Sequence, residues 1–156
     1  MSGDQLRPPV SGLVMIIGVG TDLVDIRRIE RILERSEKAF CRRVFTPEEQ
    51  ALCNRRGAKS ERKRAGAYAM RFAAKEACSK ALGTGLSQGV FWRDIVNSNL
   101  PSGQPVITLR GGARERLKSL VPAGKAPFIR VSMTDEYPTA HAIVIISAED
   151  DAAETM

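Results

Sequence analysis

The order of sequence patterns along the chain predicts an α+β fold, in which helices pack with a largely antiparallel sheet. Helical periodicity dominates from about residue 22 to residue 82, and strand patterns dominate from about residue 90 onward. The 43% hydrophobic content of the 156 residues suits one domain with a sizeable core. No apolar run reaches the roughly 20 residues that a membrane-spanning helix needs, so we expect no membrane partner.

Composition shifts mark both ends of the predicted domain. Residues 1–13 are polar and rich in proline and glycine, which is typical of a flexible extension. Residues 148–156 are acidic and are predicted to form a flexible tail. The folded domain should therefore span residues 14–147.

A buried strand is predicted to open the domain. Met15–Val19 is apolar and β-branched, and turn residues follow it at 20–22. From Asp22 onward, apolar side chains recur at helical steps, namely Leu23, Ile26, Ile29 and Leu33. Asp22 has two interpretations at this point: it caps this helix, or it is a functional carboxylate at the end of a buried strand.

Start and stop signals for helices are clear in the middle of the chain. Thr46-Pro47-Glu48-Glu49 combines a capping threonine, a proline at the first helical position and a glutamate that closes a capping box. This helix should stop at Gly57. Ser60 begins a longer helix that should continue to about Leu82, with Gly83 after it as the C-terminal glycine.

The second half of the chain changes to strand periodicity. Short apolar runs bounded by turn residues predict strands at 90–96, 105–109, 128–133 and 140–146. One more helix is predicted from about residue 113 to residue 120, and a turn at 135–138 should connect the last two strands. His141, the only histidine, alternates with apolar residues in the last strand, so we interpret it as a structural or interface residue.

Charge and cysteine content narrow the possible partners. The net charge of +6 favours anionic partners, such as phosphorylated small molecules, an acidic protein or nucleic acid. Aromatic residues make up only 5% and no nucleic-acid-binding motif occurs, so we expect no nucleic-acid partner. The wide spacing of Cys41, Cys53 and Cys78 argues against disulfides or a zinc site and favours a cytoplasmic protein.

The stretch RFAAKEACSKALGTG, residues 71–85, places charged side chains on a helix that is rich in small apolar residues. Glu76 and Lys80 lie one turn apart, and the helix ends in a Gly83-Thr84-Gly85 turn with free backbone amides. One interpretation is a surface ion pair, which contributes about 0.2–0.5 kcal/mol. The other is a site where the carboxylate, the ammonium group and the turn hold a metal–phosphate group.

Basic side chains gather at two places. The run Arg62-Lys63-Arg64, with Arg71 further along, lies at the start of the long predicted helix, where cations oppose the helix dipole. Either an anion-binding site or a solvated basic turn would explain this run. A second group lies on the first predicted helix and either docks an acidic protein surface or is simply solvated. Its members are Arg27, Arg28, Arg31 and Arg35.

Three motifs follow one another in a specific order. They are Ile17–Val24 with Arg27-Arg28-Ile29, the stretch 71–85, and Val131–Glu136. Together they resemble the holo-[acyl-carrier-protein] synthases, the short class of 4'-phosphopantetheinyl transferases, over most of the chain. The resemblance implies the phosphopantetheinyl transferase fold. It also implies transfer of the 4'-phosphopantetheine group of coenzyme A to a serine of apo-acyl carrier protein, in support of fatty acid biosynthesis.

The resemblance further implies roles for single residues. Asp22 and Glu76 match magnesium-binding carboxylates and, with Lys80, form the expected catalytic set. Lys80 matches a lysine at the phosphates of coenzyme A, and Gly83, in the adjoining turn, is also expected to bind coenzyme A. A basic region associated with coenzyme A is matched by Arg62, Lys63, Arg64 and Arg71.

Two further implications concern partners. Arg28 matches an arginine that contacts the acyl carrier protein, and short transferases of this class are typically homotrimers. Some members carry histidine where this chain has Asp135, so the role of Asp135 stays open.

The implied reaction is the attack of a serine hydroxyl on the β-phosphorus of coenzyme A. Positioning and charge neutralisation should dominate the catalysis of such a step. Lys80 would neutralise or protonate the leaving phosphate. Glu76 would activate the serine, either directly or through a metal-bound water.

Overall fold

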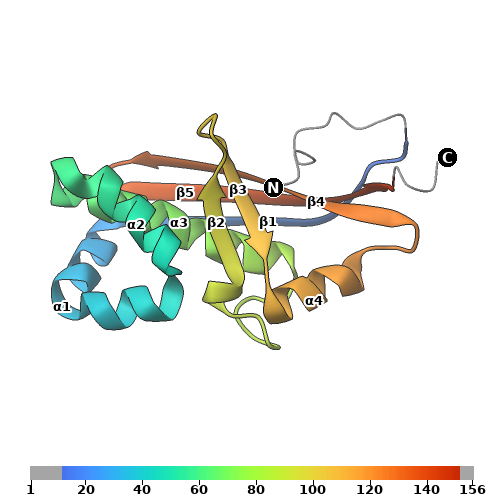
Figure 1. Cartoon of the computed structure of the whole chain (residues 1–156), viewed down its shortest axis with the longest axis horizontal. Coiled ribbons are helices and arrows are strands. Elements are labelled where there is room, and N and C mark those ends of the chain that lie inside the picture. Colours follow the sequence, from blue (N-terminus) through green and yellow to red (C-terminus); the bar gives the residue numbers. More distant parts are fainter. Residues whose placement is uncertain (1–11, 152–156) are drawn as a thin grey trace.

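A computed structural model describes residues 12–151 of the chain (Figure 1). Every strand pairing within these residues is antiparallel, and helices precede most of the strands, so the predicted α+β fold is confirmed. No helix in this part of the chain is long and apolar enough to cross a membrane. The elements are, in order, β1 (Met15–Asp25), α1 (Ile26–Val44), α2 (Pro47–Arg56), η2 (Gly57–Lys59), α3 (Glu61–Ala81), η3 (Trp92–Asp94), β2 (Ile95–Asn99), β3 (Pro105–Leu109), α4 (Gly111–Leu120), β4 (Lys125–Glu136) and β5 (Thr139–Asp150).

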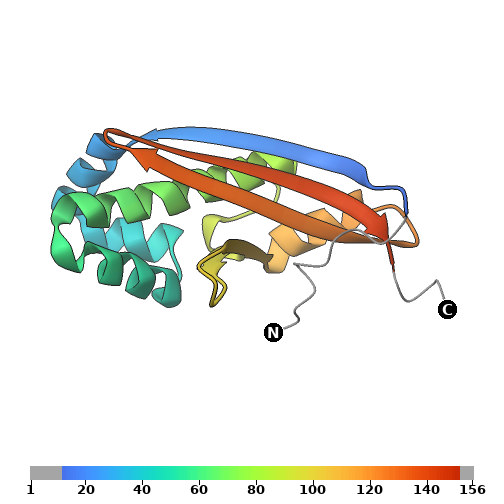
Figure 2. The ribbon, with the colours of Figure 1, turned by 90° about the horizontal axis from the view of Figure 1, so that it is seen from above.

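Three long strands form the main sheet in the order β1-β5-β4, and β2 and β3 form a separate hairpin. Figure 2 shows the helices on one side of the three strands, and α3 packs on both β1 and β5. The face of β5 toward the core is fully buried through Ala140, Ala142, Val144 and Ile146, each 0% exposed. The sheet is therefore covered by helices on one face, and α3 is the central helix of the core.

Two glycines of β1 allow α3 to lie directly on the strand. A Cβ atom at Gly18 would lie 2.1 Å from the carbonyl oxygen of Ala81, and one at Gly20 would lie 1.8 Å from that of Ala77. No side chain can occupy such a space, so strand and helix touch through their backbones. This close approach brings Asp22, two residues after Gly20, beside the C-terminal turns of α3.

The boundary between the first strand and the first helix differs from the prediction. β1 continues to Asp25 because the chain keeps pairing with β5 as far as Thr139. Leu23, expected on the buried face of a helix, is 69% exposed on the sheet. Asp25 caps α1 by accepting a hydrogen bond from the backbone N–H of Arg27 at 2.9 Å. The interpretation of Asp22 as a helix cap is therefore wrong.

The middle helices begin and end where the sequence indicates. The backbone N–H of Thr46 donates to Glu49 Oε2 at 2.8 Å, and the N–H of Glu49 donates to Thr46 Oγ1 at 3.3 Å. This reciprocal pair is the predicted capping box. Gly57 caps the end of α2, and Ser60 caps the start of α3.

Of the strands predicted in the second half, β3 matches its predicted range of 105–109, and the other three are displaced or longer than predicted. β2 begins at Ile95 rather than at residue 90, because the short helix η3 comes first. β4 and β5 extend up to their connecting turn at Tyr137-Pro138.

The predicted flexible tail begins too early. β5 continues to Asp150, and Ala148 is fully buried where it pairs with both Met15 and Pro127. Long-range pairing of this kind cannot be inferred from an acidic composition. Residues 152–156 of the predicted tail, and residues 1–11 of the predicted extension, lie outside the described residues.

Candidate active site

Lys80 and Asp22 meet where α3 crosses β1. The Nζ atom of Lys80 donates to Asp22 Oδ1 and to the carbonyl oxygen of Thr21, both at 2.9 Å. The side chain of Lys80 is 51% exposed and that of Asp22 is 17% exposed. Lys80 thus pairs with β1 rather than with Glu76, one turn before it on α3. An ion pair at the surface can exchange its partners for those of an incoming ligand.

Glu76 has a different partner, the indole of Trp92. The Nε1–H group of Trp92 donates to Glu76 Oε1 at 3.0 Å, and Glu76 is half-buried. The predicted catalytic carboxylate is therefore fixed through one of its two oxygen atoms. No sequence pattern indicates this contact, because the two residues lie on separate elements.

The carboxylates of Asp22 and Glu76 fit a magnesium site by their chemistry. They come from adjoining elements, β1 and α3, and Lys80 connects the strand to the helix turn that follows Glu76. No group of three or more His, Cys, Asp or Glu side chains within residues 12–151 could hold a metal ion by itself. Two carboxylates are enough for Mg²⁺, which keeps several waters and shares substrate phosphate oxygens.

A groove of about 450 Å³ opens beside the N-terminal half of α3. Cationic side chains dominate its wall, and the residues that line it are Arg55, Arg56, Ala58, Lys59, Lys63, Ala67, Met70 and Asp135. Arg62 lies close to the turn between β4 and β5, with its guanidinium 4.0 Å from the ring centroid of Tyr137. Of the four basic residues predicted to contact coenzyme A, Arg62 and Lys63 are exposed.

The other two basic residues, Arg64 and Arg71, face inward. Arg64 donates through Nε to Asn54 Oδ1 at 2.8 Å and forms an ion pair with Glu37, which ties α3 to α1 and α2. Arg71 is 1% exposed and donates to Asn99 Oδ1 at 2.9 Å. Its Nε and Nη1 atoms have no hydrogen-bond partner within residues 12–151. In the single chain, the guanidinium of Arg71 is thus part of the core.

The remaining predicted residues lie at the surface or in turns. Gly83 has a φ of +76°, a left-handed conformation that favours glycine, and its N–H donates to the Lys80 carbonyl oxygen at 2.9 Å. Arg28 is exposed on α1. His141 Nε2 lies 2.7 Å from the Thr21 hydroxyl oxygen.

Residues 18–142 match the family model described as the 4'-phosphopantetheinyl transferase superfamily. The chain belongs to this superfamily. It is 60% identical to the holo-[acyl-carrier-protein] synthase of Methylobacterium radiotolerans, over 86% of this chain and 95% of the relative. The corresponding enzyme of Chelativorans sp. is 57% identical over 86% of this chain and 97% of its own length.

Solved structures of the superfamily share the fold. The holo-[acyl-carrier-protein] synthase of Neisseria meningitidis superposes with a TM-score of 0.68 at 34% identity, covering 87% of this chain and 100% of that one. The Helicobacter pylori enzyme in complex with coenzyme A gives a TM-score of 0.67 at 30% identity, covering 82% of this chain and 98% of that one.

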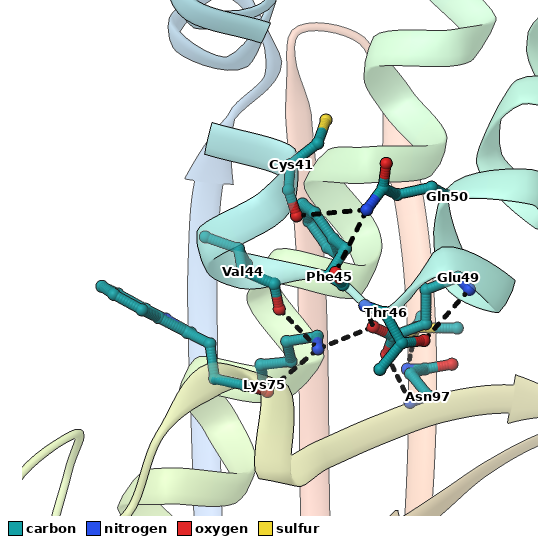
Figure 3. A network of polar contacts seen from close by, with 10 residues as sticks. Cys41, Val44, Phe45, Thr46, Glu49, Gln50, Lys75 and Asn97 are labelled. Atoms are coloured by element: carbon teal, nitrogen blue, oxygen red, sulfur yellow. Dashed lines mark hydrogen bonds and ion pairs between the residues drawn. The ribbon is translucent and has the colours of Figure 1, made fainter. Parts of the chain in front are cut away.

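A buried polar network in this superfamily member was not predicted from the sequence (Figure 3). Lys75 and Glu49 form an ion pair at 2.8 Å, with side chains 0% and 1% exposed. Lys75 Nζ also donates to the carbonyl oxygens of Val44 at 2.8 Å and Trp92 at 2.9 Å. The second oxygen of Glu49 accepts from the backbone N–H of Asn97 at 2.7 Å. Burial lowers the pKa of Lys75, and the neighbouring carboxylate of Glu49 opposes this shift.

This network joins α1, α2, α3, η3 and β2 at one point, beside Glu76. The sequence contains part of the signal for this network, because Glu49 is the residue that closes the predicted capping box. A lysine among the small apolar residues of 71–85 was the other part of the signal. Spacing alone could not pair the two, since 26 residues separate them.

Proposed function

We propose that this chain transfers the 4'-phosphopantetheine group of coenzyme A to a serine of apo-acyl carrier protein. The products are holo-acyl carrier protein and adenosine 3',5'-bisphosphate, and the reaction supports fatty acid biosynthesis. The observation that carries the proposal is the contact between Lys80 and Asp22 one turn from Glu76, in a chain 60% identical to a holo-[acyl-carrier-protein] synthase.

Lys80 is suited to bind a phosphate oxygen. An ammonium group has three N–H donors, and within the described residues Lys80 uses two of them, on Asp22 and Thr21. The third remains for the pyrophosphate of coenzyme A, and the half-exposed side chain can follow it. In this role Lys80 neutralises the negative charge that develops on the leaving bisphosphate.

Glu76 is suited to take the proton of the attacking serine. Trp92 engages its Oε1 atom, which leaves Oε2 to act on the serine hydroxyl, either directly or through a metal-bound water. The bond between the serine oxygen and the β-phosphorus forms as the bond to the leaving phosphate oxygen breaks. Holding the hydroxyl in line for this displacement is the main contribution that the protein can make.

We propose magnesium dependence on the basis of the donor set. Asp22 and Glu76 would hold the ion, which when bound neutralises and polarises phosphate oxygens. Lys80 occupies one oxygen of Asp22, so the ammonium group keeps this carboxylate neutralised before the substrate binds.

The basic groove supports coenzyme A as the substrate. Its four cationic side chains suit phosphate groups, and Lys63 connects it to the predicted coenzyme-binding residues. Lys63 and Glu76 are thirteen residues apart on α3, which the helical rise converts to about 20 Å. Only a long substrate can reach both places, and coenzyme A is such a substrate.

The positive charge of the chain supports an acidic protein partner. Arg28 is exposed on α1 together with Arg27, Arg31 and Arg35. Long-range attraction between this surface and an acidic carrier protein would be screened by salt. The Michaelis constant for the carrier should therefore rise as the salt concentration increases.

A homotrimer is supported by the face of the main sheet that no helix within residues 12–151 covers. Val19 and Leu23 on β1 are 58% and 69% exposed, and Ile143 and Ile145 on β5 are both 36% exposed. Val19 pairs directly with Ile145, so these side chains form one apolar strip on neighbouring strands. A second copy of the chain would bury this strip, and multi-angle light scattering measures how many copies assemble.

We also propose that the protein works in the cytoplasm. Cys41, Cys53 and Cys78 are free and buried. Burial raises the pKa of the Cys53 and Cys78 thiols to about 12, so both stay protonated and unreactive. Free structural thiols are typical of a reducing compartment.

The decisive experiment mixes the protein with coenzyme A, Mg²⁺ and apo-acyl carrier protein and then weighs the carrier by mass spectrometry. A gain of one phosphopantetheine supports the proposal, and no gain with any carrier tested contradicts it. Glu76→Gln should abolish the gain and leave the circular dichroism spectrum unchanged. Retention of the parent chain on DNA without any transfer would favour a nucleic-acid-binding protein instead.

A further inference from the structure

Trp92 touches α3 through two different groups. Its indole N–H donates to Glu76 Oε1 at 3.0 Å, and its backbone carbonyl oxygen accepts from Lys75 Nζ at 2.9 Å. Lys75 and Glu76 are neighbours in the sequence but face different surroundings, since Lys75 is fully buried and Glu76 is half-buried. Two consecutive residues of one helix therefore hold a single residue of η3 by its backbone and by its side chain.

Two further contacts restrict the indole ring. The ring of Phe72 lies 6.3 Å from that of Trp92 between centroids, at an interplanar angle of 30°. The guanidinium of Arg43, in the last turn of α1, lies 5.2 Å from the centroid of the indole ring. Contacts from α1 and α3 thus leave the N–H group little freedom to turn away from Glu76.

An indole N–H is a donor only, so it binds a carboxylate oxygen that carries no proton. Hydrogen bonds to an ionised group are shorter and stronger than those between neutral groups. The contact therefore fixes the side-chain rotamer of Glu76 and reserves Oε1. Oε2 is the oxygen that stays available for the reaction.

We propose that Trp92 is the positioning residue of the Glu76 carboxylate, and that Lys75 sets the place of Trp92 through its backbone carbonyl group. The consequence for the reaction rests on the proposed function, because it requires Glu76 to act on the serine or the metal. The contact itself does not depend on that function. The buried Lys75–Glu49 pair is thereby linked to the site, because Lys75 anchors Trp92, which in turn orients Glu76.

Trp92 is the only tryptophan of the chain, so a proton–nitrogen NMR spectrum contains one indole N–H signal. In Glu76→Ala this signal should shift and its hydrogen exchange should accelerate, because the acceptor is gone. Glu61→Ala is the matched control, since Glu61 lies on the same helix with a side chain 86% exposed, and the signal should not move. An unchanged signal in Glu76→Ala overturns the proposal without reference to any enzymatic activity.

The functional arm uses Trp92→Phe, which keeps an aromatic ring next to Phe72 and removes the N–H donor. The turnover number for phosphopantetheine transfer should fall about tenfold, as expected for the loss of one hydrogen bond to a charged group. The Michaelis constants for coenzyme A and carrier, and the melting temperature, should stay near the parent values. Parent-like turnover overturns the positioning role, and so does a change confined to a Michaelis constant, which would indicate direct substrate contact. If the parent chain transfers nothing while the indole signal shifts as expected, the positioning contact stands and the proposed function fails.

Discussion

Two lysines of α3 form ion pairs of nearly the same length and have opposite surroundings. Lys75 lies 2.8 Å from Glu49 with neither side chain exposed, whereas Lys80 lies 2.9 Å from Asp22 with about half of its side chain in solvent. All three donors of Lys75 reach protein acceptors, in Val44, Glu49 and Trp92. Lys80 uses two of its donors within the described residues.

The comparison indicates that burial, rather than distance, separates the ion pair that stabilises the fold from the one that we propose to act in the reaction. A buried pair has lost its hydration and must keep every partner, because an unpaired charge in the core is strongly unfavourable. An exposed pair contributes little to stability and can exchange its partner for a substrate phosphate. Five residues along one helix are enough to separate these roles.

The largest expected effect concerns the buried pair. Glu49→Gln leaves the charge of Lys75 without a counter-ion in the core, and the free energy of unfolding should fall by about 3 kcal/mol. Adding Lys75→Met removes that charge, so the double variant should recover part of the loss. Urea denaturation of the parent, both single variants and the double variant gives the coupling energy. Additive losses would mean that the two side chains do not stabilise each other.

The exposed pair should respond in the opposite way. Lys80→Met should lower the turnover number for phosphopantetheine transfer on the order of a hundredfold, because a charge that stabilises the leaving phosphate is lost. The free energy of unfolding should change by less than about 1 kcal/mol. Lys118→Met is the matched control, since Lys118 forms another exposed ion pair, with Glu115, and both quantities should stay near the parent values. A loss of several kcal/mol in Lys80→Met would contradict the functional interpretation of this pair.

A third variant changes the packing that brings Lys80 to Asp22 and leaves both side chains in place. In Gly20→Ala the new methyl group would meet the Ala77 carbonyl oxygen, so α3 must move away from β1. We expect a loss of stability of about 1–3 kcal/mol, typical of overpacking, together with a lower turnover number. Denaturation and transfer assays on the same sample measure both. Full activity in this variant would show that the contact of Lys80 with Asp22 is not required.

The parts of this arrangement that depend on residues close together in the sequence could be predicted. The capping box of Thr46 and Glu49 and the length of α3 follow from side chains a few residues apart. Motifs rather than spacing predict roles for Asp22, Glu76 and Lys80, and spacing alone suggests a Glu76–Lys80 pair, whereas Lys80 contacts Asp22.

The errors have one physical origin, since each depends on contacts between distant segments. The sequence of the Leu23–Asp25 stretch is compatible with a strand or a helix, and pairing with β5 makes it a strand. Ala148 belongs to the sheet for the same reason. The contact between Trp92 and Lys75 depends on the packing of η3 on α3. It could not be predicted, because no sequence periodicity connects residues on different elements.

The smallest expected effect concerns a third ion pair, in which both side chains are exposed. Asp25 caps α1 and forms an ion pair with Arg27 at 2.7 Å. The side-chain hydrogen bond from Arg27 lowers the pKa of Asp25 from 3.8 to about 2. A carboxylate with a lowered pKa contributes stability that is present above the unfolded value, and this contribution is lost as the pH falls through the folded value. The stability from Asp25 should therefore decline between pH 3.8 and about pH 2.

Asp25→Asn keeps a capping side chain and removes the titrating group. Between these two pH values, the urea midpoint of this variant should fall less steeply than that of the parent. Arg27→Met should make the decline smaller, because the pKa of Asp25 in the folded state then moves back toward its unfolded value. Parallel curves for the parent and Asp25→Asn would show that even this small linkage is absent, and that this exposed ion pair has no measurable effect on stability.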